Sequence, residues 1–311
     1  MNLDEYASLT VEELNSIIEE FKRSKNAVVL GHNYQVPEIQ VLADYLGDSL
    51  RLAQLAVETD ADLIVLCGVR FMAESAAILN PDKKVIIPSR EAGCPMAAMA
   101  TPQQVEAERR KHPGALVVSY VNTSAEVKAV SDVCCTSSNA VDVVEALDAN
   151  EIIFVPDRNL GAYVASKTSK KIILWDGHCY VHSMFGREDI ELARGEHPGV
   201  RIVVHPECLP DVVNEADFVT STGGMMRLAA EHDELIVGTE IGLVERMNRE
   251  YPDKSFYPLS AFAVCRNMKM TNLPRLAFAL EHEQHIVEVP EETRVRAERA
   301  LVKMLELSPG P

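Results

Sequence analysis

The chain of 311 residues is 47% hydrophobic and 25% charged, which is enough apolar material for a sizeable core and excludes a disordered or collagen-like chain. Its net charge of −17 argues against binding to nucleic acid or to an anionic membrane, because phosphate groups would be repelled. No run reaches the roughly 18 apolar residues of a membrane span, and the first residues lack the basic start of a secretory signal. We therefore expect a cytoplasmic protein.

The first element expected along the chain is a helix that begins at Thr10, where Thr10 and Glu13 match a capping box. Short apolar runs then predict strands at residues 28–30 and 63–66, with a last strand leading to Cys94. Helical stretches of about 10–15 residues separate these runs, and this alternation predicts βαβ units with a parallel sheet.

The same pattern then repeats twice along the chain. The segment from His32 to Ser49 aligns without a gap with residues 120–137 and 205–222, at intervals of 88 and 85 residues. Each aligned segment follows an apolar strand and ends on a serine or threonine. The last strand of each copy leads to a cysteine, at intervals of 85 and 86 residues: Cys94, Cys179 and Cys265.

This repeat predicts an α/β protein of three small three-layer α/β/α domains with parallel sheets, rather than the two domains that length alone suggests. Such small domains make thin cores, so we expect them to pack with pseudo-threefold symmetry around a central cavity. The expected bounds are 1–97, 98–183 and 184–267, with a C-terminal helical segment, 268–311, packing on the first domain. Within that segment an amphipathic helix is expected at about 291–306.

Polar residues recur where the strands end, and ligands of parallel α/β sheets bind at that edge. Side chains that donate, accept or relay protons follow the first strands: His32, Tyr120 and His205, and two residues further on Tyr34, Asn122 and Glu207. Hydroxyl groups follow the second strands, at the start of helices: Ser49, Ser137 and Thr222. Since a helix N-terminus attracts anions, a small molecule with carboxylate or phosphate groups is the expected ligand.

The three matched cysteines indicate a metal centre with one open coordination position. Zinc with three protein ligands and a water is one alternative, but catalytic zinc usually takes histidine. An iron–sulfur cluster is the better match for ligation by thiolates alone, and its open iron could act as a Lewis acid. His178 and His182 flank Cys179 and could be hydrogen-bond donors to the cluster, although His182 could equally be a packing residue. The remaining cysteines are expected in the core and the matched aspartates in structural roles: Cys67, Cys134, Cys135 and Cys208, and Asp44, Asp132 and Asp217.

Six short segments together point to a known family. They are GHNYQ from Gly31, GCPMA from Gly93, GHCYVH from Gly177, HPEC from His205, STGGM from Ser221 and CRNMK from Cys265. In combination they resemble quinolinate synthase, the A protein of bacterial and archaeal NAD synthesis, and the resemblance extends from about residue 10 to 306.

This resemblance implies a condensing enzyme of the transferase class in de novo NAD biosynthesis. Iminosuccinate (iminoaspartate) and dihydroxyacetone phosphate would give quinolinate, with loss of phosphate and two waters. It also implies one oxygen-sensitive [4Fe–4S] cluster per chain, with one iron open to substrate and three ligands: Cys94, Cys179 and Cys265. An L-aspartate oxidase that supplies iminosuccinate is the implied transient partner. The implied substrate contacts are His32, Ser49, Tyr120, Val121, Asn122, Ser137, His205, Pro206, Glu207 and Thr222.

For the chemistry, Glu207 with His205 beside it is the expected base, and Tyr34 and His32 are the expected donor and relay. Two alternatives remain at this stage. One is a different hydro-lyase with an open iron that acts on a hydroxy acid. The other is a non-enzymatic three-lobed binding protein with a structural, cysteine-bound zinc.

Overall fold

The computed structural model describes residues 1–308, so the last three residues of the expected 268–311 segment lie outside the described residues. The chain divides into two compact units. Unit 1 consists of Met1–Cys94 and Cys265–Arg294, and unit 2 consists of Pro95–Val264 and the described part of Val295–Pro311. Within residues 1–308 no helix is both long and apolar enough to cross a membrane.

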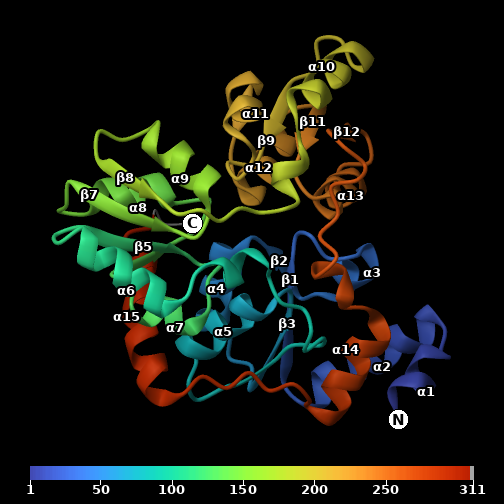
Figure 1. The fold of residues 1–311 in the computed structure, drawn as a ribbon. Coiled ribbons are helices and arrows are strands. Elements are labelled where there is room, and N and C mark those ends of the chain that lie inside the picture. The colour runs from blue at the N-terminus through green and yellow to red at the C-terminus, as the bar shows by residue number, and fades with distance from the viewer. Residues whose placement is uncertain (309–311) are drawn as a thin grey trace. The chain divides into compact units, whose positions relative to one another are not determined.

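Unit 1 is built on one parallel sheet with the strand order β2-β1-β3-β4 (Figure 1). Its strands are β1 (Ala27–His32), β2 (Tyr45–Gly47), β3 (Leu63–Cys67) and β4 (Lys84–Ile86). Its helices are α1 (Leu3–Ala7), α2 (Val11–Ser24), α3 (Pro37–Leu42), α4 (Ser49–Glu58), α5 (Arg70–Leu79) and α14 (Leu273–His282). The expected capping box is confirmed: the Thr10 hydroxyl accepts the Glu13 N–H at 3.3 Å, and the Glu13 carboxylate accepts the Thr10 N–H at 2.8 Å.

Unit 2 contains two further parallel sheets, with the strand orders β6-β5-β7-β8 and β10-β9-β11-β12. The strands are β5 (Leu116–Tyr120), β6 (Val133–Cys135), β7 (Glu151–Val155), β8 (Lys171–Leu174), β9 (Ile202–Val204), β10 (Phe218–Val219), β11 (Glu234–Gly238) and β12 (Ser255–Pro258). The helices are α6 (Pro102–Lys111), α7 (Ala125–Ala129), α8 (Ala140–Ala146), α9 (Arg158–Ala165), α10 (Arg187–Glu196), α11 (Pro210–Glu215), α12 (Thr222–Glu231) and α13 (Ile241–Glu250). The C-terminal helix α15 (Glu291–Glu306) has the expected bounds, and its residues from Val295 onward belong to unit 2.

All three sheets have one strand order, in which the first strand of each copy lies between the second and the third. The expected fold class, α/β with three parallel sheets flanked by helices, is therefore confirmed. The domain bounds, the packing of the 268–311 segment on the first domain and the pseudo-threefold arrangement stay predictions.

A matched aspartate fixes the start of the first strand in each copy. Its carboxylate accepts a backbone N–H group of that strand at 2.7–2.8 Å: Asp44 from Val29, Asp132 from Val117 and Asp217 from Ile202. A basic residue of the preceding helix pairs with each carboxylate: Lys22, Arg109 and Arg194. These aspartates are structural, as expected, and the three copies share side-chain contacts as well as strand order.

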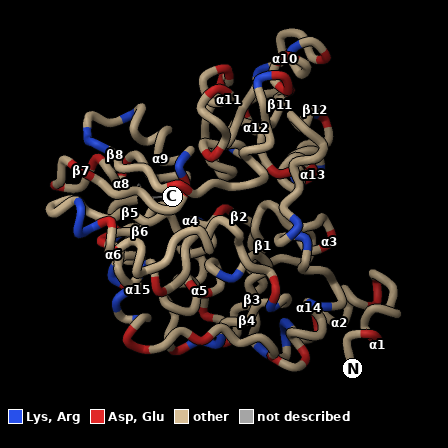
Figure 2. Tube along the Cα trace, viewed as in Figure 1, with Lys and Arg blue, Asp and Glu red and all other residues tan. Residues whose placement is uncertain are grey.

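The central strands are buried on both faces, which accounts for their continuous apolar runs. Every residue of β3 is buried, and Val65 packs in one core cluster with Ile18 of α2 and Leu280 of α14. Figure 2 shows the acidic and basic positions of each unit mainly on helices and connecting loops. The sheets are thus apolar supports, and polar side chains gather where their strands end.

Candidate active site

The two strand-end histidines, His32 and His205, are held in the same way by the backbone. His32 is the last residue of β1, and His205 directly follows β9. The Nδ1 atom of each ring accepts the N–H group two residues further on, Tyr34 at 3.1 Å and Glu207 at 3.3 Å. Because Nδ1 is the acceptor, the neutral ring carries its proton on Nε2. In unit 2 the Nε2 atom of His205 lies 3.1 Å from the hydroxyl of Ser137, to which it donates.

The three predicted hydroxyl groups lie near helix N-termini without being the caps. Asp48 caps α4 and Ser221 caps α12, so Ser49 and Thr222 are the first helical residues. Ser137 lies in the loop before α8, whose N-cap is Asn139.

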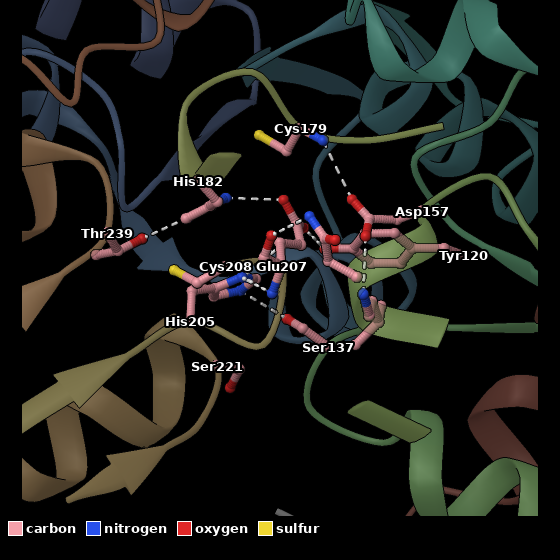
Figure 3. A network of polar contacts seen from close by, with 12 residues as sticks. Tyr120, Ser137, Asp157, Cys179, His182, His205, Glu207, Cys208, Ser221 and Thr239 are labelled. Atoms are coloured by element: carbon pink, nitrogen blue, oxygen red, sulfur yellow. Dashed lines mark hydrogen bonds and ion pairs between the residues drawn. The ribbon is translucent and has the colours of Figure 1, made fainter. Parts of the chain in front are cut away.

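Glu207 lies at the centre of a buried polar network in unit 2, and only 3% of it is exposed (Figure 3). One carboxylate oxygen accepts from the phenol of Tyr120, and the other accepts from Nδ1 of His182 at 2.8 Å. The far side of the His182 ring contacts the hydroxyl of Thr239 at 2.9 Å, and the ring stacks on His205 with centroids 4.4 Å apart. The network therefore joins the β5 strand end to the loop after β9.

The pKa values of two buried carboxyl groups, Glu207 and Asp157, are shifted in opposite directions. Burial alone would raise the pKa of Glu207, but the nearby His182 and His205 and the hydrogen bonds from His182 and Tyr120 outweigh it and lower the pKa to about 2. Burial, and then the charge of Glu207, raise the pKa of Asp157 well above its usual range.

Helix α9 begins beside this network, and Asp157 at its start contacts the loop that carries Cys179. One carboxylate oxygen caps helix α9 by accepting the N–H of Leu160 at 2.8 Å, and the other accepts the N–H of Cys179 at 3.2 Å. Nearby, the amide of Asn159 donates to the backbone carbonyl of Glu207 at 3.0 Å. The start of α9 thus holds both the loop that carries Cys179 and the turn that carries Glu207.

The three matched cysteines occupy equivalent loops. In each copy the first N–H of the helix after the third strand donates, at 2.8–2.9 Å, to the carbonyl two residues before the cysteine: Arg70 to Ala92, Arg158 to Gly177 and Ile241 to Ala263. A 3-10 helix follows each cysteine: η1 (Met96–Met99), η2 (His182–Met184) and η3 (Met268–Met270).

Burial divides the seven cysteines into two groups. The matched residues are partly exposed: Cys94, Cys179 and Cys265. The others are fully buried, and burial raises the pKa of each thiol, which confirms their expected place in the core: Cys67, Cys134, Cys135 and Cys208.

The surroundings of Cys179 could hold a metal centre. Its sulfur, a ring nitrogen of His182 and a carboxylate oxygen of Glu207 all lie within 4.8 Å of one another. Partly exposed thiols can reach a cofactor, whereas the buried ones cannot, so the matched cysteines fit the expected thiolate-bound cluster. Unit 1 holds Cys94 and Cys265, and unit 2 holds Cys179. That all three share one cluster stays a prediction.

Sequence reasoning missed Asp157, Asn159 and Thr239, and left the role of His182 open. The repeat contains one signal that could have found Asp157, because the helices after the third strands are capped at matched positions by Val69, Asp157 and Glu240. An acidic residue replaces an apolar one there in two of the copies.

A buried carboxylate that a tyrosine and a histidine both contact, with a strongly lowered pKa, is typical of sites that move protons, so the fold and the site define an α/β enzyme. The sequence profile of the family described as quinolinate synthetase A protein matches residues 16–306, and the chain belongs to this family. The resemblance inferred from the six segments is thereby confirmed, and the non-enzymatic alternative is not supported.

Curated relatives with related names match nearly the whole chain. "Quinolinate synthase 1" of Methanosarcina acetivorans is 53% identical over 290 residues, which cover 93% of this chain and 95% of the relative. A quinolinate synthase of Dehalococcoides mccartyi is 52% identical over 298 residues, 95% of this chain and 99% of the relative. A third quinolinate synthase, from Thermodesulfovibrio yellowstonii, is 48% identical over 301 residues, which cover 96% of this chain and 98% of the relative.

Proposed function

We propose that the chain is a quinolinate synthase, which condenses iminosuccinate with dihydroxyacetone phosphate in de novo NAD biosynthesis. The observation that carries this proposal is the equivalence of the three cysteine loops, which share a backbone contact, a following 3-10 helix and partial exposure. The family and the names of the relatives support the same reaction. An L-aspartate oxidase would supply iminosuccinate, and a reducing cytoplasm would keep the thiols available as ligands.

The proposed cofactor is one [4Fe–4S] cluster with the ligands Cys94, Cys179 and Cys265. When bound, it supplies a Lewis-acidic iron for a hydroxyl or carboxylate oxygen of the substrate. The N–H groups at the starts of α4 and α12, beside Ser49 and Thr222, would hold carboxylate or phosphate oxygens. His205 would donate a hydrogen bond from Nε2 to the substrate, either directly, in place of its bond to Ser137, or by way of the Ser137 hydroxyl.

Asn122 offers a separate reason to place substrate at the Tyr120–Asn122 turn. Its amide oxygen is buried and has no hydrogen-bond partner among residues 1–308. An unsatisfied buried acceptor costs about 1–3 kcal/mol, so a donor on the ligand would stabilise it. The imine or enamine nitrogen of the condensing substrate carries such a proton. The neighbouring contacts proposed from the family, Val121 in this turn and Pro206 beside His205, would shape the same pocket.

We assign proton abstraction to Glu207 together with His182. A carboxylate with a pKa of about 2 is always ionised at physiological pH but is a weak base by itself. Its hydrogen bond to Nδ1 orients the imidazole and stabilises the protonated ring, as in other carboxylate–histidine pairs. Tyr120, which also donates to Glu207, can return a proton. In unit 1, Tyr34 and His32 remain the proposed donor and relay.

Anaerobic purification tests this function. We expect iron and acid-labile sulfide at about four of each per chain, and formation of quinolinate from dihydroxyacetone phosphate and iminosuccinate generated from oxaloacetate and ammonium. A colourless, air-stable protein with one zinc would overturn the cluster. A brown protein that dehydrates hydroxy acids but forms no pyridine ring would instead be the alternative hydro-lyase.

A further inference from the structure

A lysine lies fully buried beneath the turn that follows β5. Lys128, on the short helix α7, is 0% exposed. Its ammonium group donates to the backbone carbonyls of Val121, at 2.8 Å, and Thr123. Burying an ammonium group costs several kcal/mol unless hydrogen bonds compensate it. An apolar side chain would fill the same space without this desolvation penalty, so the lysine indicates a role for its hydrogen bonds.

The first copy of the repeat has the same device with another side chain. Gln40, on α3, is also buried, and its amide donates to the carbonyls of Asn33 at 2.9 Å and Gln35 at 3.0 Å. Gln40 and both carbonyls lie 88 residues before Lys128 and its two acceptors, which is the repeat interval. A buried donor on the following helix therefore holds the strand-end turn through the same two carbonyls in both copies.

In the third copy the matched residue is Val213, which has no donor to offer. There the turn is held from elsewhere, because Asn159 donates to the carbonyl of Glu207. In all three copies a side chain donates to a backbone carbonyl of the strand-end turn, although it comes from a different element in the third copy.

The two carbonyls that Lys128 holds lie on either side of Asn122, whose buried amide oxygen lacks a partner among the described residues. At the start of the turn Tyr120 donates to Glu207, and its carbonyl accepts from the hydroxyl of Thr123 at 2.9 Å. Rotation of either peptide group held by Lys128 would redirect Asn122.

We propose that Lys128 is a positioning residue that fixes the Tyr120–Thr123 turn, so that Asn122 presents its amide to the iminosuccinate-derived substrate. This inference rests on the proposed function for the identity of that substrate. Lys128 does not touch the substrate; it acts through the two carbonyls, and any buried donor of similar reach can replace it.

The test compares Lys128→Gln, which copies the first repeat, with Lys128→Met, which keeps the volume but removes the donor. We expect Lys128→Met to raise KM for iminosuccinate about tenfold and Lys128→Gln to restore it to within about twofold of the unchanged enzyme. Lys22→Met is the control for loss of a buried lysine, since Lys22 donates to the carbonyl of Leu42 and pairs with Asp44, outside the Tyr120–Thr123 turn. It should lower the melting temperature without changing KM.

Amide hydrogen exchange at residues 121–124 provides a readout that does not depend on activity. Exchange should accelerate in Lys128→Met and remain slow in Lys128→Gln. If Lys128→Met does not fold, Lys128→Gln still decides, because a folded Gln variant with a rapidly exchanging turn would contradict the proposal. Unchanged KM in the Met variant, or a Gln variant as impaired as Met, would also contradict it. Failure of the unchanged enzyme to form quinolinate would refute the proposed function instead, and exchange would still test the turn.

Discussion

Replacing Glu207 with glutamine tests the electrostatics of the site most directly. The pKa of Glu207 is lowered from 4.5 to about 2, which at about 1.4 kcal/mol per unit means that its surroundings favour the charged over the neutral form by about 3 kcal/mol. Since folding lowers this pKa, the stabilisation is fully present above pH 4.5 and is lost as the pH falls toward 2. At pH 7, Glu207→Gln should lower the free energy of unfolding by about 1.5–3 kcal/mol, because the hydrogen bonds from Tyr120 and His182 lose their charged acceptor.

The same substitution should stop proton transfer. Tyr120 and His182 both donate to the carboxylate, but a glutamine amide can accept at its oxygen only, so its N–H group must donate to the phenol oxygen of Tyr120 or, if His182 moves its proton to Nε2, to Nδ1 of His182. Either arrangement removes the negative charge that would stabilise a protonated His182 ring, and we expect kcat to fall by about 100-fold to 10,000-fold.

Quinolinate formation, the absorbance of the cluster and urea unfolding, all measured without oxygen at pH 7, check these effects together. Activity and unfolding free energy should fall while the cluster absorbance is unchanged. The control is Glu215→Gln, because Glu215 pairs with Arg187 at the surface, and it should change none of the three. A Glu207→Gln enzyme with near-normal kcat would refute the proton-transfer assignment, and one with unchanged unfolding free energy would refute the electrostatic reasoning.

Three further substitutions distinguish the proposed metal centre from the core. Cys179→Ser should abolish activity and most iron binding in the purified protein, and retained iron would exclude Cys179 as a ligand. Cys67→Ala removes a buried thiol and should cost about 1 kcal/mol of stability with iron content unchanged; loss of iron would contradict its place in the core. Asp157→Asn should speed iron loss to a chelator, because one amide N–H must face the N–H of Leu160 or Cys179; equal rates would show that this contact does not support the cysteine loop.

Much of the fold could be predicted because the repeat makes each strand and helix visible three times. Short apolar runs are ambiguous singly, but the matched aspartates and cysteines fixed their register, and the three sheets have one strand order. The repeat also selected the strand-end residues, because those positions are set by local strand and turn geometry.

The repeat contains no signal that predicts side-chain contacts between different copies. His182 and Glu207 are 25 residues apart in the chain, and Asn159 reaches the carbonyl of Glu207 across 48 residues. Both contacts depend on how neighbouring sheets pack in unit 2, which no local period encodes. Lys128 was missed for another reason: a lysine on a short helix is usually solvated, and only the fold shows that this one is buried.

The matched positions two residues after His32, Tyr120 and His205 show how a repeated backbone can carry different chemical groups. They hold Tyr34, Asn122 and Glu207, and in two copies the same N–H donates to the preceding histidine. The sheets therefore fix three similar backbone positions, and the side chains there differ as a phenol, an amide and a carboxylate. The proposed condensation of two different substrates would need a donor, an acceptor and a charge. The repeat supplies the positions, and the differences among its copies supply the chemistry.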